Sequence, residues 1–494
     1  MKNTPATLLA DFYKLSHREQ YPEKTEFVYS TLTPRSNKYF PKADKIIVFG
    51  VQGFVKKYLI EYFNKHFFRR PKQEILNDYI RIVKNALGKE NPETKHIEEL
   101  HDLGYLPIKI RAIKEGSLVP MRVPVLTIEN TDKRFFWLTN YLETILSTET
   151  WQPMTSATIA YQYRKLLDKY ALKTVGDTEA VGFQGHDFSM RGMSSLESSQ
   201  TSGAGHLLSF NGTDTIPAIV YLEEYYDANV EKELVGSSIS ATEHSVMCSY
   251  GDKNEFDLFK HLMTSVYPSG FFSVVSDTWD FWKVIGEYLP KLKNEVMSRE
   301  GKVVIRPDSG DPVLILIGDP YGETELERKG LIECLWDIFG GTKTKKGYKL
   351  LDSHIGAIYG DSITLDRCER IVEGLEAKGF ASTNVVFGIG SYTYQYNTRD
   401  TFGFAVKATH AIVDGKERML FKNPKTDDGT KRSQRGRVAV INVNGELALI
   451  DELTIQTYNL EFKNHDQMED VFIDGKLVRN QSLQDIRKRI EESK

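Results

Sequence analysis

The chain has 494 residues, of which 40% are hydrophobic and 27% charged, and it is too long for one ordinary core, so we predict two or three domains. With no repeat period and no long polar tract, this composition excludes a disordered chain, a collagen, a solenoid and a coiled coil. The formal net charge of −4 excludes the broad positive surface typical of nucleic-acid-binding proteins, so we expect no nucleic-acid partner.

The three cysteines, Cys248, Cys334 and Cys368, are odd in number and widely spaced, which supports neither a disulfide framework nor a thiolate metal site. This usage fits a reducing cytoplasm, where we expect the protein to be located. The N-terminal segment lacks the apolar stretch of a signal peptide, and no window approaches the roughly eighteen apolar residues that span a bilayer. We therefore expect a cytoplasmic protein with no membrane association.

Residues 1 to about 145 mix helical patterns with β segments. The segment 107–120 reads as alternating β structure, and the aromatic run 135–146 has a helical pattern that closes the region. The first region is therefore predicted to contain both helices and strands.

From about residue 180 to 395 the pattern becomes strand, small-residue loop and helix, repeated. Four predicted strands are apolar without alternation, as strands covered on both faces are: 271–276, 302–307, 355–360 and 384–390. A periodic helical segment, 362–379, follows the loop after the third of them. Such βα units predict a central β/α barrel, either TIM-like or irregular.

After about residue 395 the chain becomes β-rich again. Three dipeptides between β-prone residues have the composition of hairpin turns: Asp414-Gly415, Asn444-Gly445 and Asp474-Gly475. We predict an α/β fold in which residues 1–145 and 396–494 together build a flanking α+β domain. Residues 146–395 would form the barrel-like catalytic domain.

Polar residues gather where the predicted barrel strands end, which is where β/α barrels place their chemistry. Four strand ends carry them: Ser273 and Asp277, Arg306 and Asp308, Gly360 and Asp361, and 388–391. One pair, Arg306 and Asp308, could equally be an internal ion pair. The backbone N–H groups of Gly360 and Asp361, before a helix, could hold a phosphate, or Ser362 could be a purely structural N-cap.

Absent motifs narrow the chemistry. The chain has no GxxxxGK[ST], HExxH, GxSxG or CxxC motif, so Walker-type nucleotide binding, zincin chemistry and the hydrolase elbow lose support. None of the four strand ends presents the lysine that a Schiff-base aldolase needs. A site rich in Asp, Arg and backbone N–H groups remains, and it suits a phosphorylated sugar bound with a divalent cation.

A second polar cluster lies earlier, in residues 185–215. Phe188 and Arg191 stand near its start, and a stretch of small residues leads to Asp214. An aromatic residue such as Phe188 more often belongs to a core than to a binding site. Likewise, His244 in the segment SATEHS is more often a structural histidine than a catalytic one.

Seven segments, in this order and at these separations, resemble the nicotinamide phosphoribosyltransferase family: HDFSMRGMSS, FNGTDT, SATEHS, VVSDTWD, VVIRPDSGDP, YGDSI and FGIGS. The likeness runs from LLADFYKLSHREQYP to GKLVRNQSLQDIRKR and covers essentially the whole chain. It implies transfer of phosphoribose from phosphoribosyl pyrophosphate to nicotinamide, giving nicotinamide mononucleotide and pyrophosphate in NAD salvage. The neutral pyridine nitrogen offers its own lone pair, so the attack needs no general base.

The resemblance also implies roles for residues at the base. Phe188 would stack on the pyridine ring, opposite Tyr13 supplied by the partner subunit of a homodimer. Asp214 would accept a hydrogen bond from the carboxamide N–H. Arg306 and Ser273 would lie near the amide oxygen.

For the sugar and phosphates, the resemblance implies that Asp308 holds ribose hydroxyls and that Asp277 lies near the ribose and the magnesium-bound phosphates. Both carboxylates would help to bind Mg²⁺, through bound phosphates or water. Arg191 would sit between base and phosphate. The 5′-phosphate would contact Gly360, Asp361, Gly390 and Ser391. The pyrophosphate charge, across the dimer interface, would be balanced by Arg35, Arg399 and Lys407.

The family further implies that ATP is a co-substrate. His244 would be phosphorylated by ATP, whose hydrolysis favours synthesis, and Lys431 in a basic loop would lie near that phosphate. The active sites would lie at the homodimer interface.

The chain departs from the family pattern at three places. Animal enzymes have three glycines where this chain has Ile389-Gly390-Ser391, so Ser391 could donate a hydrogen bond in the phosphate loop. The usual Gly-Tyr after Phe188 is replaced by Ser189-Met190. Gly356 occupies a position where arginine is common in the family, at the mouth of its tunnel. We expect altered affinity for extended ligands more than lost activity.

Three alternatives remain open on sequence alone. Nicotinate phosphoribosyltransferase shares the architecture and sugar donor, but a carboxylate at Asp214 accepts from an amide and repels a second carboxylate. A non-catalytic sensor could bind pyridine nucleotides without turnover, although Asp277, Arg306, Asp308 and His244 are all present. A barrel enzyme for another phosphosugar would not need Phe188 together with Asp214.

Overall fold

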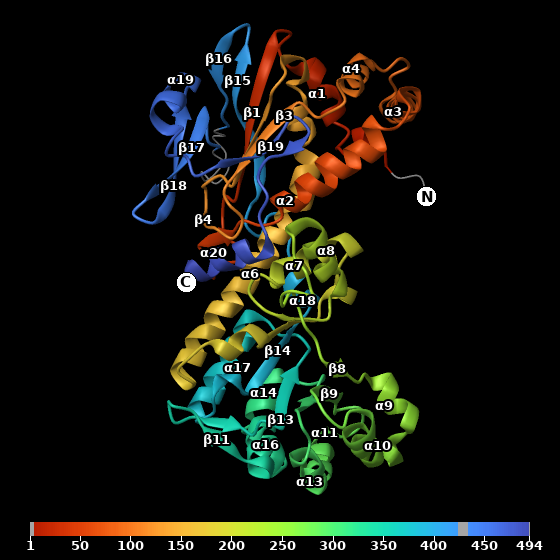
Figure 1. Cartoon of the computed structure of the whole chain (residues 1–494), viewed down its shortest axis with the longest axis vertical. Helices are drawn as coiled ribbons and strands as arrows, with labels where there is room; N and C mark the ends of the chain where they lie inside the picture. The colour runs from red at the N-terminus through yellow and green to blue at the C-terminus, as the bar shows by residue number, and fades with distance from the viewer. Residues whose placement is uncertain (1–3, 423–432, 494) are drawn as a thin grey trace. The chain divides into compact units, whose positions relative to one another are not determined.

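The computed structural model describes residues 4–422 and 433–493, which form two compact units (Figure 1). Unit 1 contains the described residues of the segments Met1–Thr158, Tyr221–Ala228 and Asn397–Lys494. Unit 2 contains Ile159–Val220 and Asn229–Tyr396. Each unit has its own sheet and is described separately below.

Unit 1 is built around a seven-stranded antiparallel sheet in the order β16-β15-β1-β5-β3-β19-β20. The strand bounds are Thr25–Thr33 (β1), Ile108–Ala112 (β3), Leu126–Asn130 (β5), Ala405–Val413 (β15), Lys416–Met419 (β16), Glu469–Ile473 (β19) and Lys476–Leu477 (β20). Because β1 pairs with β15 and β3 with β19, both chain ends contribute strands to one sheet. Helices α3 (Lys72–Leu87) and α4 (Lys95–Leu103) add buried apolar residues to the same core.

The three predicted hairpin turns are confirmed. They join β15 to β16, β17 (Arg437–Val443) to β18 (Glu446–Leu453), and β19 to β20. Both residues of each turn have a positive φ, between 48° and 89°. Asn-Gly and Asp-Gly dipeptides adopt this left-handed pair at low cost, which matches the twist of the flanking strands.

The changes of unit fall at residues 158 and 396, where we expected 145 and 395. The helical run that begins in α5 (Leu138–Tyr141) continues as α6 (Glu143–Thr174), and the change of unit falls inside α6 at residue 158. The second half of α8 (Ile216–Tyr226) also belongs to unit 1.

Contacts within unit 1 explain the placement of that half-helix. The backbone N–H of Gly53 donates to the Tyr226 hydroxyl, and the side-chain amide of Gln52 donates to the carbonyls of Tyr225 and Gln481. A Cβ on Gly53 would lie 1.8 Å from the Tyr221 hydroxyl, so only glycine permits this approach. Such long-range hydrogen bonds leave no periodic signal in the sequence.

Unit 2 holds one parallel sheet in the order β7-β6-β14-β13-β10-β9-β8. The bounds are Gly185–Asp187 (β6), Gly212–Thr213 (β7), Ser240–Ala241 (β8), Phe272–Val275 (β9), Val303–Arg306 (β10), Ile355–Tyr359 (β13) and Val385–Ile389 (β14). A parallel bridge between Gly212 of β7 and Ser237, just before β8, links the two edges of the sheet. The strands therefore follow one another in chain order around an irregular barrel, and the predicted α/β barrel fold is confirmed.

The four strands predicted between 271 and 390 are present within one or two residues of their predicted bounds. Their buried, non-alternating side chains are covered outside by helices, including α14 (Pro312–Ile317), α16 (Leu331–Phe339) and α17 (Leu365–Ala377) (Figure 1). A Cβ on Gly374 would lie 2.9 Å from the Ile317 side chain, so this glycine allows α17 to approach α14 closely. No described helix is both long and apolar enough to cross a bilayer.

A buried carboxylate lies in α10 (Glu255–His261), away from the strand ends. Glu255 is 2% exposed, and its Oε1 atom has no hydrogen-bond partner among the residues that the structure describes. Burial raises the pKa of Glu255 to about 7, with Lys283 lowering it, Asp280 raising it and a hydrogen bond to Tyr288 lowering it. The folded protein therefore binds a proton at this side chain that the unfolded chain releases near its ordinary pKa of 4.5.

We expect the difference in the free energy of unfolding between Glu255→Gln and the unsubstituted protein to shift in favour of the variant as the pH rises, because the unsubstituted protein loses stability. The stabilisation from protonated Glu255 is complete below the unfolded pKa and is lost as the pH rises through about 7. A shift of this size corresponds to about 3 kcal/mol at most. Denaturant unfolding of both proteins from pH 5 to pH 8 measures the difference, and a pH-independent difference would contradict the assignment.

Candidate active site

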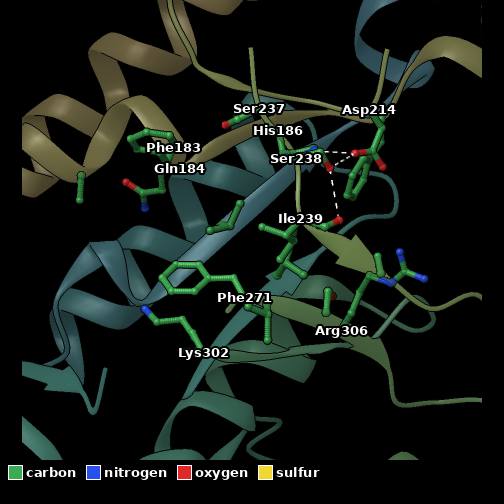
Figure 2. Close-up of a pocket in the computed structure, with 18 of the residues that line it drawn as sticks. Phe183, Gln184, His186, Asp214, Ser237, Ser238, Ile239, Phe271, Lys302 and Arg306 are labelled. Atoms are coloured by element: carbon green, nitrogen blue, oxygen red, sulfur yellow. Dashed lines mark hydrogen bonds and ion pairs between the residues drawn. The ribbon is translucent and has the colours of Figure 1, made fainter. Parts of the chain in front are cut away.

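A cavity of about 360 Å³ lies inside the barrel of unit 2 (Figure 2). Every barrel strand, or the residue directly beside it, contributes to the lining. At the carboxyl ends of the strands the lining includes Phe188, Asp214 and Arg306, and at the opposite end it includes Phe183, Phe271 and Lys302.

A second, polar space of about 860 Å³ lies over the carboxyl ends of the strands. It shares Phe188, Asp214, Ala241 and Arg306 with the interior cavity, so the two spaces are continuous. The other lining residues of this cleft come from the loops after β6, β8, β10, β13 and β14. The barrel thus offers an apolar slot that opens into a polar cleft, as small-molecule sites on barrels do.

Phe188 lies where the slot meets the cleft, against two glycines of neighbouring strands. A Cβ on Gly388 would lie 2.4 Å from the Phe188 ring and 2.6 Å from Cα of Gly360. A Cβ on Gly360 would lie 3.0 Å from the same ring. The ring can take this position only because both strands lack side chains there, so Phe188 is held by the site and does not belong to the general core.

Asp214 lies at the head of the slot. Its Oδ1 atom is 2.8 Å from Nε2 of His186 and accepts a hydrogen bond of 2.5 Å from the Ser238 hydroxyl (Figure 2). Burial raises the pKa of Asp214, but the hydrogen bonds from His186 and Ser238 and the charge of Arg306 outweigh it and bring the pKa below its ordinary value. Asp214 is therefore a carboxylate at neutral pH, and 48% of its side chain is exposed.

Two polar groups with unused hydrogen-bonding capacity line the slot near Asp214. The Ser273 hydroxyl and Nε of Arg306 are buried and have no hydrogen-bond partner in the part of the chain that the structure describes, while Nη2 of Arg306 donates to the carbonyl of Thr242 at 2.6 Å. An unmade hydrogen bond on a buried polar atom costs free energy unless a ligand supplies the partner. Both atoms therefore favour a polar ligand in the slot.

The predicted alternative of an Arg306–Asp308 ion pair is wrong. Among the described residues, the carboxylate of Asp308 lies instead beside His244, whose Nε2 is 3.9 Å from it and 3.8 Å from Asp277. Nδ1 of His244 is 3.1 Å from the Thr278 hydroxyl, and the imidazole is 47% exposed. The structure therefore brings together Asp277 and Asp308 of two predicted strand ends, and it places His244 beside them.

Asp277 fixes the loop after β10. Its Oδ2 atom accepts from the backbone N–H of Asp308 at 2.8 Å and from the Ser309 hydroxyl at 2.6 Å. The Tyr359 hydroxyl donates to the carbonyls of Ser309 and Gly310, both at 2.9 Å. These contacts set the position of the Asp308 carboxylate before any ligand binds.

The pair Asp277 and Asp308 is compatible with a bound Mg²⁺. Oδ1 of Asp277 is buried without a hydrogen-bond partner among residues 4–422 and 433–493, and Asp308 is partly exposed in the cleft. Magnesium is commonly held by one or two carboxylates with the remaining ligands from water and phosphate. Within 4–422 and 433–493, no cluster of three or more His, Cys, Asp or Glu side chains could hold a metal.

The loop after β13 differs from the prediction in one respect. Helix α17 begins at Leu365 and is capped by the Thr364 hydroxyl, so Ser362 is not the N-cap. Ser362 has a φ of +53°, and its carbonyl accepts from Arg367 at 2.6 Å. The Thr364 hydroxyl accepts from the Arg367 N–H, so the cap comes from outside the Gly360–Ser362 loop, whose backbone could serve as an anion ligand.

Across the cleft, the loop after β14 carries Gly390 and Ser391, and the short turn after β6 carries Arg191. All three line the cleft. A Cβ on Gly390 would meet nothing within 4 Å. Arg191 is exposed.

At the far end of the slot, the space beside Gly356 is taken by a lysine. A Cβ on Gly356 would lie 3.1 Å from Cδ of Lys302, whose Nζ is 5.9 Å from the Phe271 ring centroid. Burial lowers the pKa of Lys302, with Asp352 raising it. The space that a side chain at position 356 would occupy is therefore partly filled by Lys302, which directly precedes the neighbouring strand β10.

The remaining predicted residues belong to unit 1. Tyr13 and Lys407 line a hollow of about 430 Å³ there, and Arg35 donates to the carbonyl of Gly403. Burial lowers the pKa of Lys407, Glu143 raises it, and the charges of Arg35, Lys14 and Arg399 lower it further. These cations therefore lie close together in unit 1. Lys431 is outside the described residues.

Sequence reasoning missed four contributors to the site: His186, Ser238, Thr242 and Tyr359. His186 lies within the segment GHDF, two residues before Phe188, so its place beside the predicted site residues was a signal that could have identified it as a hydrogen-bond partner of Asp214. The other three act through contacts across the barrel that no spacing reveals.

The chain matches two models of protein families. The model described as the nicotinate phosphoribosyltransferase (NAPRTase) family matches residues 183–476. The model of the nicotinamide phosphoribosyltransferase N-terminal domain matches residues 6–110.

Curated relatives cover nearly the whole chain. A nicotinamide phosphoribosyltransferase of Acinetobacter baylyi is 52% identical over 97% of this chain and 96% of its own length. Those of Mycoplasma pneumoniae and Xanthomonas campestris are 38% and 34% identical, over 87% and 97% of this chain and 94% and 97% of theirs.

Solved structures share the fold at low sequence identity. A nicotinate-nucleotide pyrophosphorylase from Pyrococcus furiosus superimposes with a TM-score of 0.58 at 15% identity, covering 100% of this chain and 97% of that one. Human nicotinic acid phosphoribosyltransferase gives 0.51 at 14% identity, covering 98% and 93%.

We expect Gly388→Ala to displace Phe188 and to destabilise the protein by about 1 to 3 kcal/mol, because the added methyl overlaps both the ring and Cα of Gly360. Gly390→Ala is the matched control, since it adds the same methyl two residues away into open space. Denaturant unfolding of both variants tests this, and equal free energies of unfolding for the two variants would show that the position of Phe188 does not require glycine at position 388.

Proposed function

The chain belongs to the nicotinamide phosphoribosyltransferase family, and we propose that it forms nicotinamide mononucleotide and pyrophosphate from nicotinamide and phosphoribosyl pyrophosphate. In this reaction the pyridine ring occupies the slot beside Phe188, and the phosphoribose occupies the cleft over the strand ends. The family assignment rests on relatives that match along the full chain.

The observation that carries the substrate choice is the ionised Asp214 at the head of the slot. A carboxylate there accepts a hydrogen bond from the amide N–H of nicotinamide and repels the carboxylate of nicotinic acid. The unpartnered Ser273 hydroxyl and Nε of Arg306 supply donors for the amide oxygen. All three side chains line the same slot as Phe188.

The chemistry depends on electrostatics and not on a general base. The pyridine nitrogen attacks with its own lone pair, and the barrier is the departure of pyrophosphate from an oxocarbenium-like carbon. Asp277 and Asp308 place negative charge beside the developing cation, and the loop contacts described above hold Asp308 in place before the substrate arrives. A Mg²⁺ bound there through phosphate and water would neutralise the leaving pyrophosphate.

We assign the phosphates to the two loops that face each other across the cleft. Arg191, with the backbone around Gly360 and Asp361 and around Gly390 and Ser391, would bind the 5′-phosphate. Tyr13, Arg35, Arg399 and Lys407 would be supplied by the second subunit of a homodimer. The cations that lower the pKa of Lys407 support an anionic ligand at their site, because a bound pyrophosphate would relieve their mutual repulsion.

We also propose that ATP phosphorylates His244, with Lys431 near the phosphate. The imidazole is half-exposed, as a phosphoryl acceptor must be; it lies beside Asp308, which lines the cleft, and its Nδ1 atom is 3.1 Å from the Thr278 hydroxyl. The nearby Asp277 and Asp308 would hold the Mg²⁺ that accompanies ATP.

The proposed reaction is tested by incubating the purified protein with phosphoribosyl pyrophosphate, Mg²⁺ and either nicotinamide or nicotinic acid, with and without ATP. Mass spectrometry identifies the mononucleotide formed. Selective formation of nicotinamide mononucleotide supports the proposal. The acid mononucleotide would reassign the chain to the nicotinate enzyme, and ligand binding without product would indicate a sensor.

We expect Asp214→Asn to narrow the preference for nicotinamide over nicotinic acid. The amide removes the repulsion of a second carboxylate, which is worth about 1 to 3 kcal/mol, or roughly 5- to 150-fold in the ratio of catalytic efficiencies. Ser238→Ala, which keeps the carboxylate and removes one of its donors, is the control and should retain the preference. An unchanged ratio in Asp214→Asn would overturn the role of this residue.

We expect radiolabel from the γ-phosphate of ATP to appear on the protein in an acid-labile form and to be lost in His244→Asn, together with the gain that ATP gives to synthesis. His261→Asn is the matched control, since His261 is an exposed histidine of α10 outside the slot and cleft. Equal labelling of both variants would contradict the assignment of His244.

A further inference from the structure

The turn that carries Arg191 is docked against the phosphate loop through a missing side chain. The turn is η6 (Met190–Gly192), and its partner is the short helix α18 (Ser391–Tyr394). A Cβ on Gly192 would lie 2.0 Å from Oγ and 2.5 Å from Cβ of Ser391. Ser391 therefore fills the space that any side chain at position 192 would occupy.

Backbone strain does not explain this glycine. Gly192 is not among the residues with positive φ, so an alanine could adopt the backbone conformation. The obstacle is the side chain of Ser391 alone. Rotation about χ1 of Ser391 would move Oγ away but would leave its Cβ in place, so an added methyl forces the turn and the loop apart.

A hydrogen bond ties the same two elements on the other side of the contact. The backbone N–H of Ser194, two residues after the turn, donates to Oε1 of Gln395 at 2.9 Å. Gln395 directly follows α18, so Ser391 and Gln395 hold the Arg191 turn from both ends of that helix.

The helix α18 is itself firmly anchored. Tyr394 is fully buried, and its hydroxyl lies 2.7 Å from Nδ1 of His206. Burial lowers the pKa of His206 to about 4, so the ring is neutral; its Nε2 donates to the carbonyl of Gly212 at 3.0 Å, which leaves Nδ1 to accept from Tyr394. The Thr393 hydroxyl donates to the carbonyl of Ile363 at 2.9 Å.

We propose that Ser391 and Gln395, acting through Gly192 and Ser194, are positioning residues that hold Arg191 in place to bind the phosphate of phosphoribosyl pyrophosphate. The inference rests on the proposed function for the identity of the anion. Arg191 is exposed and long, so it loses conformational freedom when it binds, and a turn fixed at both ends lowers that loss. Ser391 thus contributes through packing, in addition to any hydrogen bond to the ligand.

The test is a double-substitution cycle with Gly192→Ala, Ser391→Gly and both together. In Gly192→Ala we expect KM for phosphoribosyl pyrophosphate to rise about tenfold or more, because small displacements of a positioned group carry large kinetic costs. The Kd for nicotinamide alone should stay within about twofold, because the slot contacts neither residue. In the double variant, KM should return to within about twofold of Ser391→Gly.

Substitutions at Gln395 provide an independent test of the same proposal. Gln395→Ala removes the acceptor for Ser194, whereas Gln395→Glu keeps an oxygen at the same place. We expect the first to raise KM for phosphoribosyl pyrophosphate and the second to restore it. A residue with a merely structural role would instead change the amount of folded protein and leave KM unmoved.

Three results would overturn the inference: a Gly192→Ala protein with unchanged KM, a double variant that is not rescued, or parallel losses in nicotinamide binding. If the unsubstituted protein makes no mononucleotide, the proposed function fails first. The contact between the Arg191 turn and α18 is then judged by calorimetric binding of inorganic phosphate, the group that we assign to Arg191, to the same four proteins. Weaker binding in Gly192→Ala with recovery in the double variant supports it, and equal binding in all four overturns it.

Discussion

Parallel strand pairing is the constraint on which the rest of unit 2 depends. Because the strands of the barrel run in one direction, their carboxyl ends meet at one rim, and residues far apart in the chain come within contact distance there. Phe188 after β6 and Asp308 after β10 line one cleft for this reason, and Asp277 after β9 accepts a hydrogen bond from the Asp308 backbone. Close approach of the strands then depends on glycines, since Gly360 and Gly388 leave room for the aromatic ring.

The electrostatics of the rim separate its carboxylates into two kinds. Asp214 is provided with donors from His186 and Ser238 and has a lowered pKa, so it is ready to accept one more hydrogen bond. Asp277 has one oxygen used by the Asp308 loop and one buried oxygen that, among the described residues, accepts no hydrogen bond and has His244 3.8 Å away. The first arrangement suits recognition of a neutral amide, and the second suits a cation.

Local signals predicted the fold class and much of the site's residue content. Apolar strand runs, Asp-Gly and Asn-Gly turns and strand-end polar residues each have a short-range physical cause, so they could be read directly from the sequence. The ordered segments around Phe188, Asp214 and Asp308 added the family. Contacts between distant residues were not predictable: the passage of α6 through a unit boundary, the Tyr221–Ala228 segment in unit 1, and the donors to Asp214. The alternative of Ser362 as an N-cap is wrong, because Thr364 two residues later takes that place.

The closure of the barrel has a mechanical consequence. Its edges meet at β7 and β8, two strands of only two residues each, and they are joined by the bridge from Gly212 to Ser237. Strands this short contribute few ladder hydrogen bonds, so this seam is where the ring of strands opens at least cost. The Ser238–Asp214 hydrogen bond crosses the same seam. A ligand that contacts Asp214 on one side and Ser273 or Arg306 on the other therefore links the two sides of this seam. Binding of a ligand in the slot thus also stabilises the closed barrel.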